Sequence, residues 1–174
     1  MKLFSYLHTL LLAFALTGLS ATAHAETFVG SNVDSRVLVG LKVNSDGVQS
    51  LMPEGWASIP FSGGPMKGSN LLFALIDGVL EMDPEGKPLD PASRRASVLV
   101  GLGKKDDTVR MYVLRILTTV PERDPYDVAI AAEIERTQSL SGPANGARTI
   151  SDEWQIMTEG GGELTFTLDY TTGK

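Results

Sequence analysis

The stretch Ala96–Thr118, ASVLVGLGKKDDTVRMYVLRILT, holds two apolar runs separated by a charged turn. The first run, Ala96–Leu102, is almost entirely apolar, and the glycine, lysine and aspartate residues of Gly103–Asp107 are typical of a hairpin turn. The second run, Thr108–Thr118, alternates, and one of its predicted faces consists of Val109, Met111, Val113 and Leu117. The stretch therefore predicts two antiparallel strands joined by a tight turn.

Further strands are predicted on both sides of this hairpin. Upstream, Arg36–Val43 alternates as a half-buried strand does, and Asn70–Ile76 is a nearly continuous apolar run that suits a strand covered on both faces. Downstream, Ser151–Met157 and Glu163–Tyr170 form a second predicted hairpin. Tyr126–Leu140 fits both a helix and a strand, and we favour a strand for its second half because two strands follow it.

The remaining segments predict short helices and loops. Asp46 is in position to cap a short helix that Pro53 ends, Gly63–Ser69 is a glycine-rich flexible loop, and Asp83–Pro91 is dense in turn-forming residues. No internal repeat is present. The predicted fold class is therefore α+β, mostly antiparallel β with one or two short helices, in a single domain spanning residues 26–174.

The first 25 residues have the three regions of a secretory signal peptide. Lys2 gives a positive start, Leu3–Leu19 is apolar, and Ala23–Ala25 reads Ala-His-Ala, a typical cleavage site. Polar residues interrupt the apolar run, which disfavours a permanent transmembrane helix. The sequence therefore predicts cleavage after Ala25 and a soluble, exported protein, periplasmic or secreted, with no stable membrane anchor.

Composition excludes several classes of chemistry. The formal charge of −6 and the pI near 4.9 argue against nucleic acid as a partner. The two histidines, His8 and His24, lie in the predicted signal peptide, and the chain has no cysteine. Catalytic Ser-His-Asp and Cys-His sites, the usual zinc sites, and haem or iron–sulfur ligation by His or Cys would lack their residues after cleavage. We therefore expect neither a metal nor a cofactor.

Asp77 and Arg115 stand out because each falls in phase with apolar residues of its predicted strand. Charges on apolar faces are rare unless they are paired or line a wet cavity. Either the two residues clear the core at strand ends, or they meet inside a barrel mouth and contact a polar group of a ligand. Lys67, in the flexible loop, is placed to reach an anionic ligand over such a pocket.

The segment Arg36–Arg123 resembles the acetoacetate decarboxylase-like superfamily. Leu51–Trp56, LMPEGW, is similar to the turn that follows the opening strand and helix of that family, and Val113–Arg123, VLRILTTVPER, resembles the segment carrying its active-site lysine pair. The resemblance implies a partial or cone-like β barrel around an interior cavity. Glu122 and Arg123 stand where those decarboxylases have paired lysines, so the resemblance implies no Schiff base here.

Taken together, these features predict an exported protein that binds a small apolar or carbonyl-bearing ligand in a β-barrel cavity, without Schiff-base catalysis. The predicted ligand-binding residues are Asp77, Arg115, Lys67, Trp56 and Glu122. One alternative is a decarboxylase-like lyase that uses Asp77 or Glu122 as an acid or base. Another is a periplasmic protein-interaction module that exposes sheet edges. A homodimer is also expected if the domain is half of a barrel.

Overall fold

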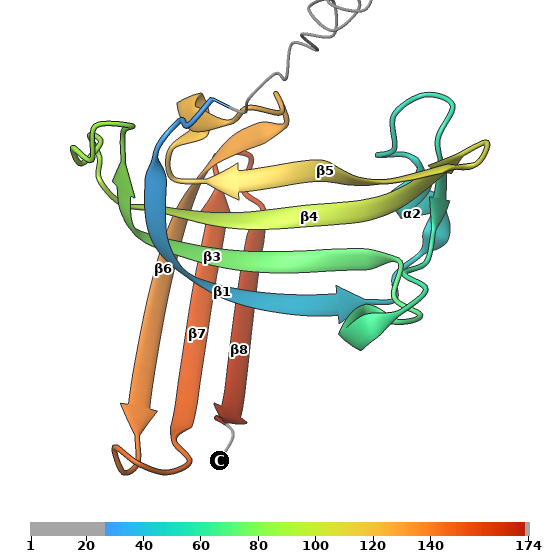
Figure 1. Ribbon diagram of the computed structural model, residues 1–174. Coiled ribbons are helices and arrows are strands. Elements are labelled where there is room, and N and C mark those ends of the chain that lie inside the picture. Colours follow the sequence, from blue (N-terminus) through green and yellow to red (C-terminus); the bar gives the residue numbers. More distant parts are fainter. Residues whose placement is uncertain (1–26, 173–174) are drawn as a thin grey trace, which may run out of the picture.

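The computed structural model describes residues 27–172, so the predicted signal peptide lies outside the described residues. A curled sheet of four long strands is crossed on its rear face by a three-stranded sheet that continues well below it (Figure 1). The four long strands are β1 (Ser31–Leu41), β3 (Leu71–Met82), β4 (Arg94–Lys105) and β5 (Thr108–Thr118). The three crossing strands are β6 (Ala129–Ser141), β7 (Thr149–Thr158) and β8 (Glu163–Thr171). We call these three strands the arm.

The strand order is β1-β3-β4-β5-β6-β7-β8, and the short β2 (Ala57–Ile59) pairs with β4 off this path. All pairs are antiparallel except β5 with β6, which run parallel over three residue pairs, from Ile116–Ala129 to Thr118–Ala131. The helices are α2 (Ser45–Gln49) and the 3-10 turns η1 (Gly64–Met66) and η2 (Pro121–Arg123). The prediction of a mostly β, partly closed barrel with few short helices is confirmed. No helix among residues 27–172 has the length and hydropathy needed to cross a membrane.

Two element boundaries differ from the sequence prediction for clear local reasons. The predicted strand Asn70–Ile76 stops before Asp77-Gly78, a pair that resembles a turn, but β3 runs on to Met82, because Gly78 provides a close backbone approach rather than a turn. A Cβ at Gly78 would lie 2.9 Å from the carbonyl oxygen of Arg94 on β4. The α2 helix is capped by Asn44, whose side chain accepts a hydrogen bond from the Asp46 N–H at 2.8 Å, and not by Asp46 itself.

The segment Tyr126–Leu140, for which we favoured a strand in the second half, is a strand from Ala129 onward. β6 covers Ala129–Ser141, and its alternating pattern buries Ile134 against the long sheet. The helical periodicity of this segment does not produce a helix. Pairing with β7 over ten residue positions supplies the backbone hydrogen bonds of a strand instead.

A β-bulge in β5 changes which residues share a face. Leu99 lies opposite Arg115, but the next residue of β4, Val100, lies opposite Val113, so Leu114 is an extra residue. Val113 consequently packs on the same face as Ile116, while Leu117 packs on the opposite face. The predicted alternation, which put Val113 and Leu117 together, is therefore wrong across this point.

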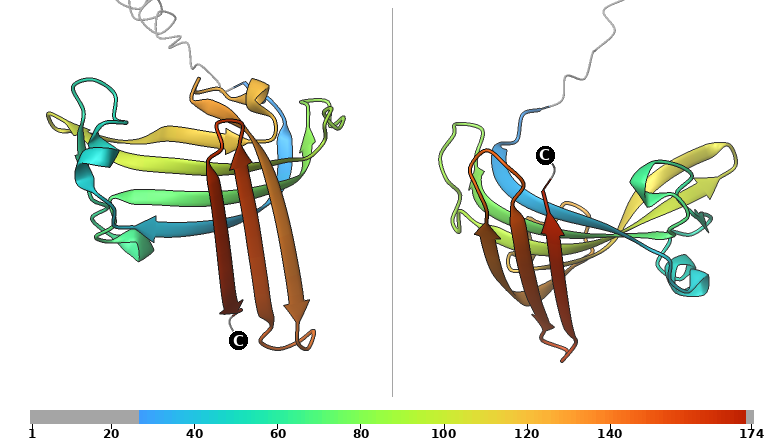
Figure 2. Two further views of the ribbon diagram at one scale, coloured as in Figure 1. Left: turned by 180° about the vertical axis from the view of Figure 1, so that it is seen from behind. Right: turned by 90° about the horizontal axis from the view of Figure 1, so that it is seen from below.

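The main core lies between the rear face of the long sheet and the arm. It consists of Phe73, Leu75, Ile134, Trp154 and Ile156. Phe73 also meets Phe166 of β8 edge to face, with ring centroids 6.1 Å apart. The view from behind shows the arm lying across this face (Figure 2). Burial of each large apolar side chain contributes about 1.5–3 kcal/mol, so this core joins the two sheets.

Candidate functional site

An apolar groove lies on the front face of the long sheet, opposite the arm. Figure 1 looks onto this face, and no strand or helix of the described part of the chain crosses it. The groove has a volume of about 710 Å³. Its floor comes from β1, β3, β4 and β5 and consists of Leu38, Leu72, Ala74, Ile76, Val98, Val100, Met111 and Val113.

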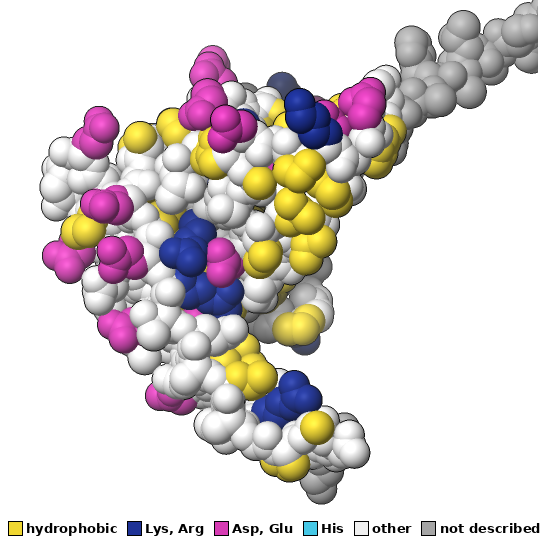
Figure 3. Space-filling model, turned by 90° about the vertical axis from the view of Figure 1, so that its left-hand side faces the viewer, with side chains coloured by type: hydrophobic (Ala, Val, Ile, Leu, Met, Phe, Trp, Pro, Cys, Tyr) yellow, Lys and Arg dark blue, Asp and Glu magenta, His cyan; other side chains and the backbone are white. Residues whose placement is uncertain are grey.

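The alternation of each strand places these side chains in the groove. Residues at every second position point to the front, while their neighbours enter the rear core. Leu38 and Met111 remain 53% and 64% exposed, although their chemistry favours burial. Hydrophobic side chains also gather on the front side of the molecule when it is viewed from the left of Figure 1 (Figure 3). The front face is therefore an uncovered apolar surface with the dimensions of a ligand site.

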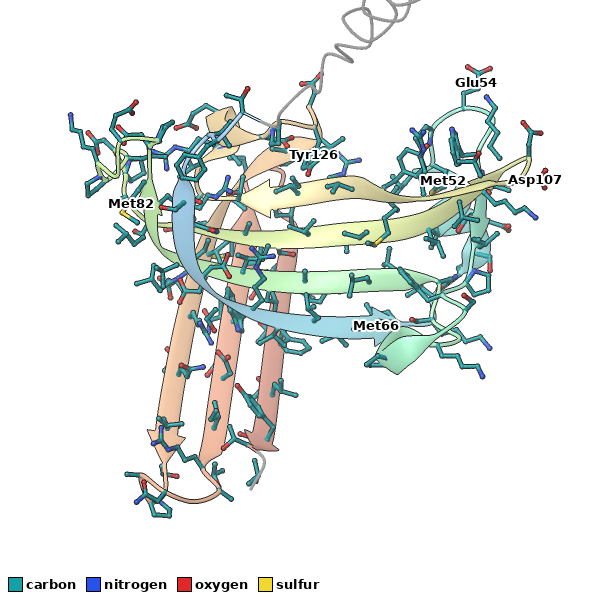
Figure 4. The ribbon with its side chains drawn as sticks, in the orientation of Figure 1. Met52, Glu54, Met66, Met82, Asp107 and Tyr126 are labelled. Carbon is teal, nitrogen blue, oxygen red and sulfur yellow. The ribbon has the colours of Figure 1, made fainter. Side chains whose placement is uncertain are left out.

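The two ends of the groove are lined by residues outside the four strands and by Tyr112 of β5. Tyr126 and Val128, from the segment after η2, line one end, and Figure 4 shows Tyr126 beside β5. Pro53 and Tyr112 line the opposite end. Behind Tyr112 stands Trp56, whose ring meets that of Tyr112 edge to face with centroids 5.0 Å apart. Trp56 thus supports a wall of the groove.

Arg36 is the one charged residue among those that line the groove. Its Nε and Nη2 atoms donate to the Asp34 carboxylate at 2.9 and 2.6 Å. The hydrogen bonds from Arg36 hold the pKa of Asp34 below its ordinary value of 3.8. A guanidinium has five N–H donors, so Arg36 keeps donors for a carbonyl or carboxylate oxygen at the rim.

A second polar constellation lies between the sheets. Asp77 on β3 accepts from Arg95 Nε and from Arg136 Nη1, both at 3.0 Å. Arg136 on β6 also donates from Nε and Nη2 to the Asp152 carboxylate at 2.8 and 2.6 Å, and Gln138 donates to the same carboxylate at 3.2 Å. We call Asp77, Arg95, Arg136 and Asp152 the inter-sheet ionic cluster.

The Arg136–Asp152 part of this cluster is buried, whereas Asp77 and Arg95 reach solvent, with side chains 20% and 36% exposed. The side chains of Arg136 and Asp152 are 5% and 0% exposed. The hydrogen bond to Asp152, and after it the one to Asp77, raises the pKa of Arg136 above its ordinary value although burial opposes this. The Arg136 guanidinium also stacks 4.8 Å from the Trp154 ring centroid. All four carboxylate oxygens accept hydrogen bonds, so the cluster is built to join the sheets.

The structure does not bring Asp77 and Arg115 together. Asp77 lies on the rear face, as its phase predicted, but Arg95 and Arg136 are its partners. Arg115 lies opposite Leu99, which lies opposite Phe73, four residues from Asp77 along β3. That separation is about 13 Å along the strand direction alone. Of the two alternatives for Asp77 and Arg115, the one in which they meet is therefore wrong.

The other predicted site residues are spread over the molecule. Lys67 is exposed in the loop after η1, beside a hollow of about 320 Å³ that Gly40 and Lys42 also line. Glu122 lies in η2, next to Arg123, whose guanidinium donates to buried Glu81 at 2.9 Å. Arg123 thus fastens η2 to β3. Of the five predicted residues, Trp56 alone adjoins the apolar groove.

Sequence reasoning missed Arg136 and Asp152. The signal that identified Asp77 was present for both: Arg136 is in phase with Ile134, and Asp152 is in phase with Ile150 and Trp154. The first was hidden because the segment around it also fitted a helix. The second lies in Ser151–Met157, where the hairpin pattern predicts a strand but does not indicate which of its faces is buried.

Comparisons with known proteins give no independent assignment. No family model, no curated protein and no solved structure matches this chain.

Proposed function

We propose that this protein binds a small, mainly apolar molecule carrying a carbonyl or carboxylate group in the groove on the front of the long sheet. The observation that supports this most directly is the uncovered apolar floor, with Leu38 and Met111 exposed above it. A volume of about 710 Å³ lies within the usual range of roughly 300–1,000 Å³ for ligand sites. Arg36 at the rim is placed to receive the polar end of the ligand.

The curled sheet is consistent with the cone-like barrel that the resemblance to acetoacetate decarboxylase-like proteins implies, and we propose that relationship on the same grounds. The Schiff-base route has no support, because no lysine is among the residues that line the groove. An acid–base lyase reaction has little support, because Asp77 and Glu122 do not line the groove either. With the signal-like residues 1–25, we propose that the protein binds its ligand after export.

Titration with decanoate and with decanol tests this function. Binding is followed by the chemical shifts of the valine methyl groups of the groove floor. We expect shifts at Val98 and Val100 with both probes and tighter binding of decanoate. Arg36→Gln is expected to remove that preference, because it removes the positive charge at the rim.

A matched pair of variants distinguishes binding in the groove from nonspecific hydrophobic binding elsewhere on the surface. Met111→Glu places a charge in the groove and is expected to weaken decanoate binding at least tenfold, about 1.4 kcal/mol. Val79→Glu is the control, because Val79 is 61% exposed on the same sheet but lies outside the groove. Equal weakening by the two variants, or no shifts at the groove floor, would overturn the proposal.

A further inference from the structure

A second hollow, of about 490 Å³, lies beside the inter-sheet ionic cluster. It is formed where β3, the start of β4, the end of β5 and β6 come together. Its lining includes Asp77, Val79, Ser93, Arg95, Thr119 and Ile134. Figure 3 looks onto the end of the long sheet where β3 ends and β4 begins, and basic and acidic side chains lie next to each other there. The volume is in the range of roughly 300–1,000 Å³ that ligand sites occupy. We call this feature the flank hollow.

The flank hollow gives access to the solvent-exposed half of the cluster. Asp77 and Arg95 are 20% and 36% exposed, whereas Arg136, the other partner of Asp77, is 5% exposed. Arg95 donates from Nε to Asp77 at 3.0 Å and from Nη1 to the carbonyl oxygen of Ile134 at 3.2 Å. A guanidinium has five N–H donors, and these contacts use two of them. Arg95 therefore keeps N–H groups on both Nη1 and Nη2 for a further acceptor.

Two hydroxyl groups lie beside Arg95. Thr119 is directly opposite Arg95, since its N–H donates to the Arg95 carbonyl oxygen at 3.0 Å and its Oγ1 accepts from the Arg95 N–H at 3.1 Å. Because Oγ1 is the acceptor in that contact, its own proton remains for a ligand. Ser93 stands two residues before Arg95 and is exposed. Donors therefore predominate at this end of the hollow, and the planar fork of Arg95 matches a carboxylate.

The charge balance of the site narrows the class of ligand further. The four ionised groups of the cluster, two acidic and two basic, balance one another, and the guanidinium of Arg94 at the hollow is bound to Glu81. A ligand that is only an anion would bring its charge close to Asp77, and one that is only a cation would approach Arg95. Each oxygen of Asp77 accepts one hydrogen bond and has a second lone pair, so Asp77 can also receive an ammonium group. A ligand with both charges matches both groups.

We propose that the flank hollow binds a zwitterionic α-amino acid, with its carboxylate on Arg95 and Thr119 and its ammonium group on Asp77. The two charged groups of an α-amino acid are bonded to the same carbon atom, and Asp77 and Arg95 are in direct contact. A peptide separates its terminal charges and matches this arrangement less well. Val79 and Ile134 supply the apolar side chains of the lining, which favours an aliphatic amino acid. The flank hollow and the apolar groove share no lining residue, so this site stands independently of the proposed function.

Three probes with related carbon skeletons test the charge requirement on the unsubstituted full chain. They are L-valine, 3-methylbutanoate, which lacks the ammonium group, and 2-methylpropan-1-amine, which lacks the carboxylate. The chemical shifts of the valine methyl groups of the protein report where each probe binds. We expect L-valine to shift Val79 and to leave Val98 and Val100 of the groove floor unchanged. Each single-charge probe is expected to bind about tenfold more weakly or worse, because it loses one charge-assisted contact and brings its remaining charge near a like charge.

Substitutions assign the contacts. Arg95→Met is expected to weaken L-valine binding by about tenfold or more. Arg110→Met, at the other end of the long sheet and outside the hollow, is the control and is expected to leave binding unchanged. Asp77→Asn is expected to abolish the preference for L-valine over 3-methylbutanoate, because an amide carries no charge, and the signals of the groove floor show whether each variant remains folded.

The probes decide the proposal even if a variant does not fold. Equal binding of the three probes would overturn it, as would the absence of a shift at Val79 with L-valine at millimolar concentrations. Shifts confined to Val98 and Val100 would assign L-valine to the groove instead and would also overturn it. Among folded variants, equal effects of Arg95→Met and Arg110→Met would have the same consequence.

Discussion

Arg136→Met tests whether the inter-sheet ionic cluster holds the two sheets together. Methionine retains much of the length and the apolar stem of arginine and removes its charge. The substitution leaves Asp77 with Arg95, but it leaves the Asp152 carboxylate, which is fully buried, with the 3.2 Å hydrogen bond from Gln138. The structural effect is therefore an almost uncompensated buried charge.

The expected size of the loss follows from this burial. Breaking a buried ion pair by removing one partner typically costs about 3–5 kcal/mol, because the stranded charge has lost its solvent and its counter-ion. Arg136 makes two hydrogen bonds to Asp152 and one to Asp77, so we expect Arg136→Met at the upper end of that range. Its side chain is only 5% exposed, so solvent screening offers little relief.

Urea unfolding followed by fluorescence measures this loss, and Arg95→Met is the matched control. Arg95 also binds Asp77, but its side chain is 36% exposed, so its removal is expected to cost about 1 kcal/mol or less. The double variant Arg136→Met with Asp152→Leu is expected to recover at least half of the single loss, since it removes both buried charges. A loss below about 1 kcal/mol for Arg136→Met would refute the reasoning.

Three further outcomes follow from the structure. Gly78→Ala is expected to cost about 1–3 kcal/mol in urea unfolding, because its Cβ would press against the backbone oxygen of Arg94. Gly47→Ala, in α2 with no atom near the new Cβ, is expected to stabilise the protein by about 0.5–1 kcal/mol; a loss there would contradict the helix assignment. Asp34 has its pKa lowered, chiefly by the hydrogen bonds from Arg36, so its contribution is present above the unfolded value near 3.8 and disappears as the pH falls through the folded value. The stability difference between the unsubstituted chain and Asp34→Asn should therefore shrink in acid, and a difference that grows in acid would have the wrong sign.

The strands could be predicted because their side chains alternate or form apolar runs, and these patterns depend on local sequence alone. The bulge in β5 could not be predicted, since it arises from pairing with β4: nothing in the residues around Leu114 marks an extra position. The same limit explains why β3 was predicted too short. Gly78 and the glycine of a turn look alike in a sequence, and only the neighbouring strand distinguishes them.

For the candidate site too, the face of a side chain could be predicted from local sequence, but its partners could not. The phase of Asp77 identified its face correctly. Its partners Arg95 and Arg136 come from β4 and β6, and the register between strands that are distant in sequence cannot be predicted from the residues of either strand. The groove was not foreseen as an open face, because its residues are ordinary strand residues whose exposure depends on what the rest of the chain leaves uncovered. The alternation of Arg36–Val43 puts Arg36 on the face opposite Val37 and Val39, and the sequence does not show that this face lines a groove.

The parallel contact of β5 and β6 spans three residue pairs, and it is the one backbone ladder among the described residues between the long sheet and the arm. Most of the attachment therefore depends on side chains, namely the core around Trp154 and the inter-sheet ionic cluster. The arm and the β3–β4–β5 part of the long sheet are assembled from hairpins, so each can gain its own hydrogen bonds early, whereas β1 pairs with β3 across the segment 42–70. Whether the molecule unfolds in one cooperative transition or in two thus depends on a few buried residues, and substitutions there change the cooperativity of unfolding as well as its free energy.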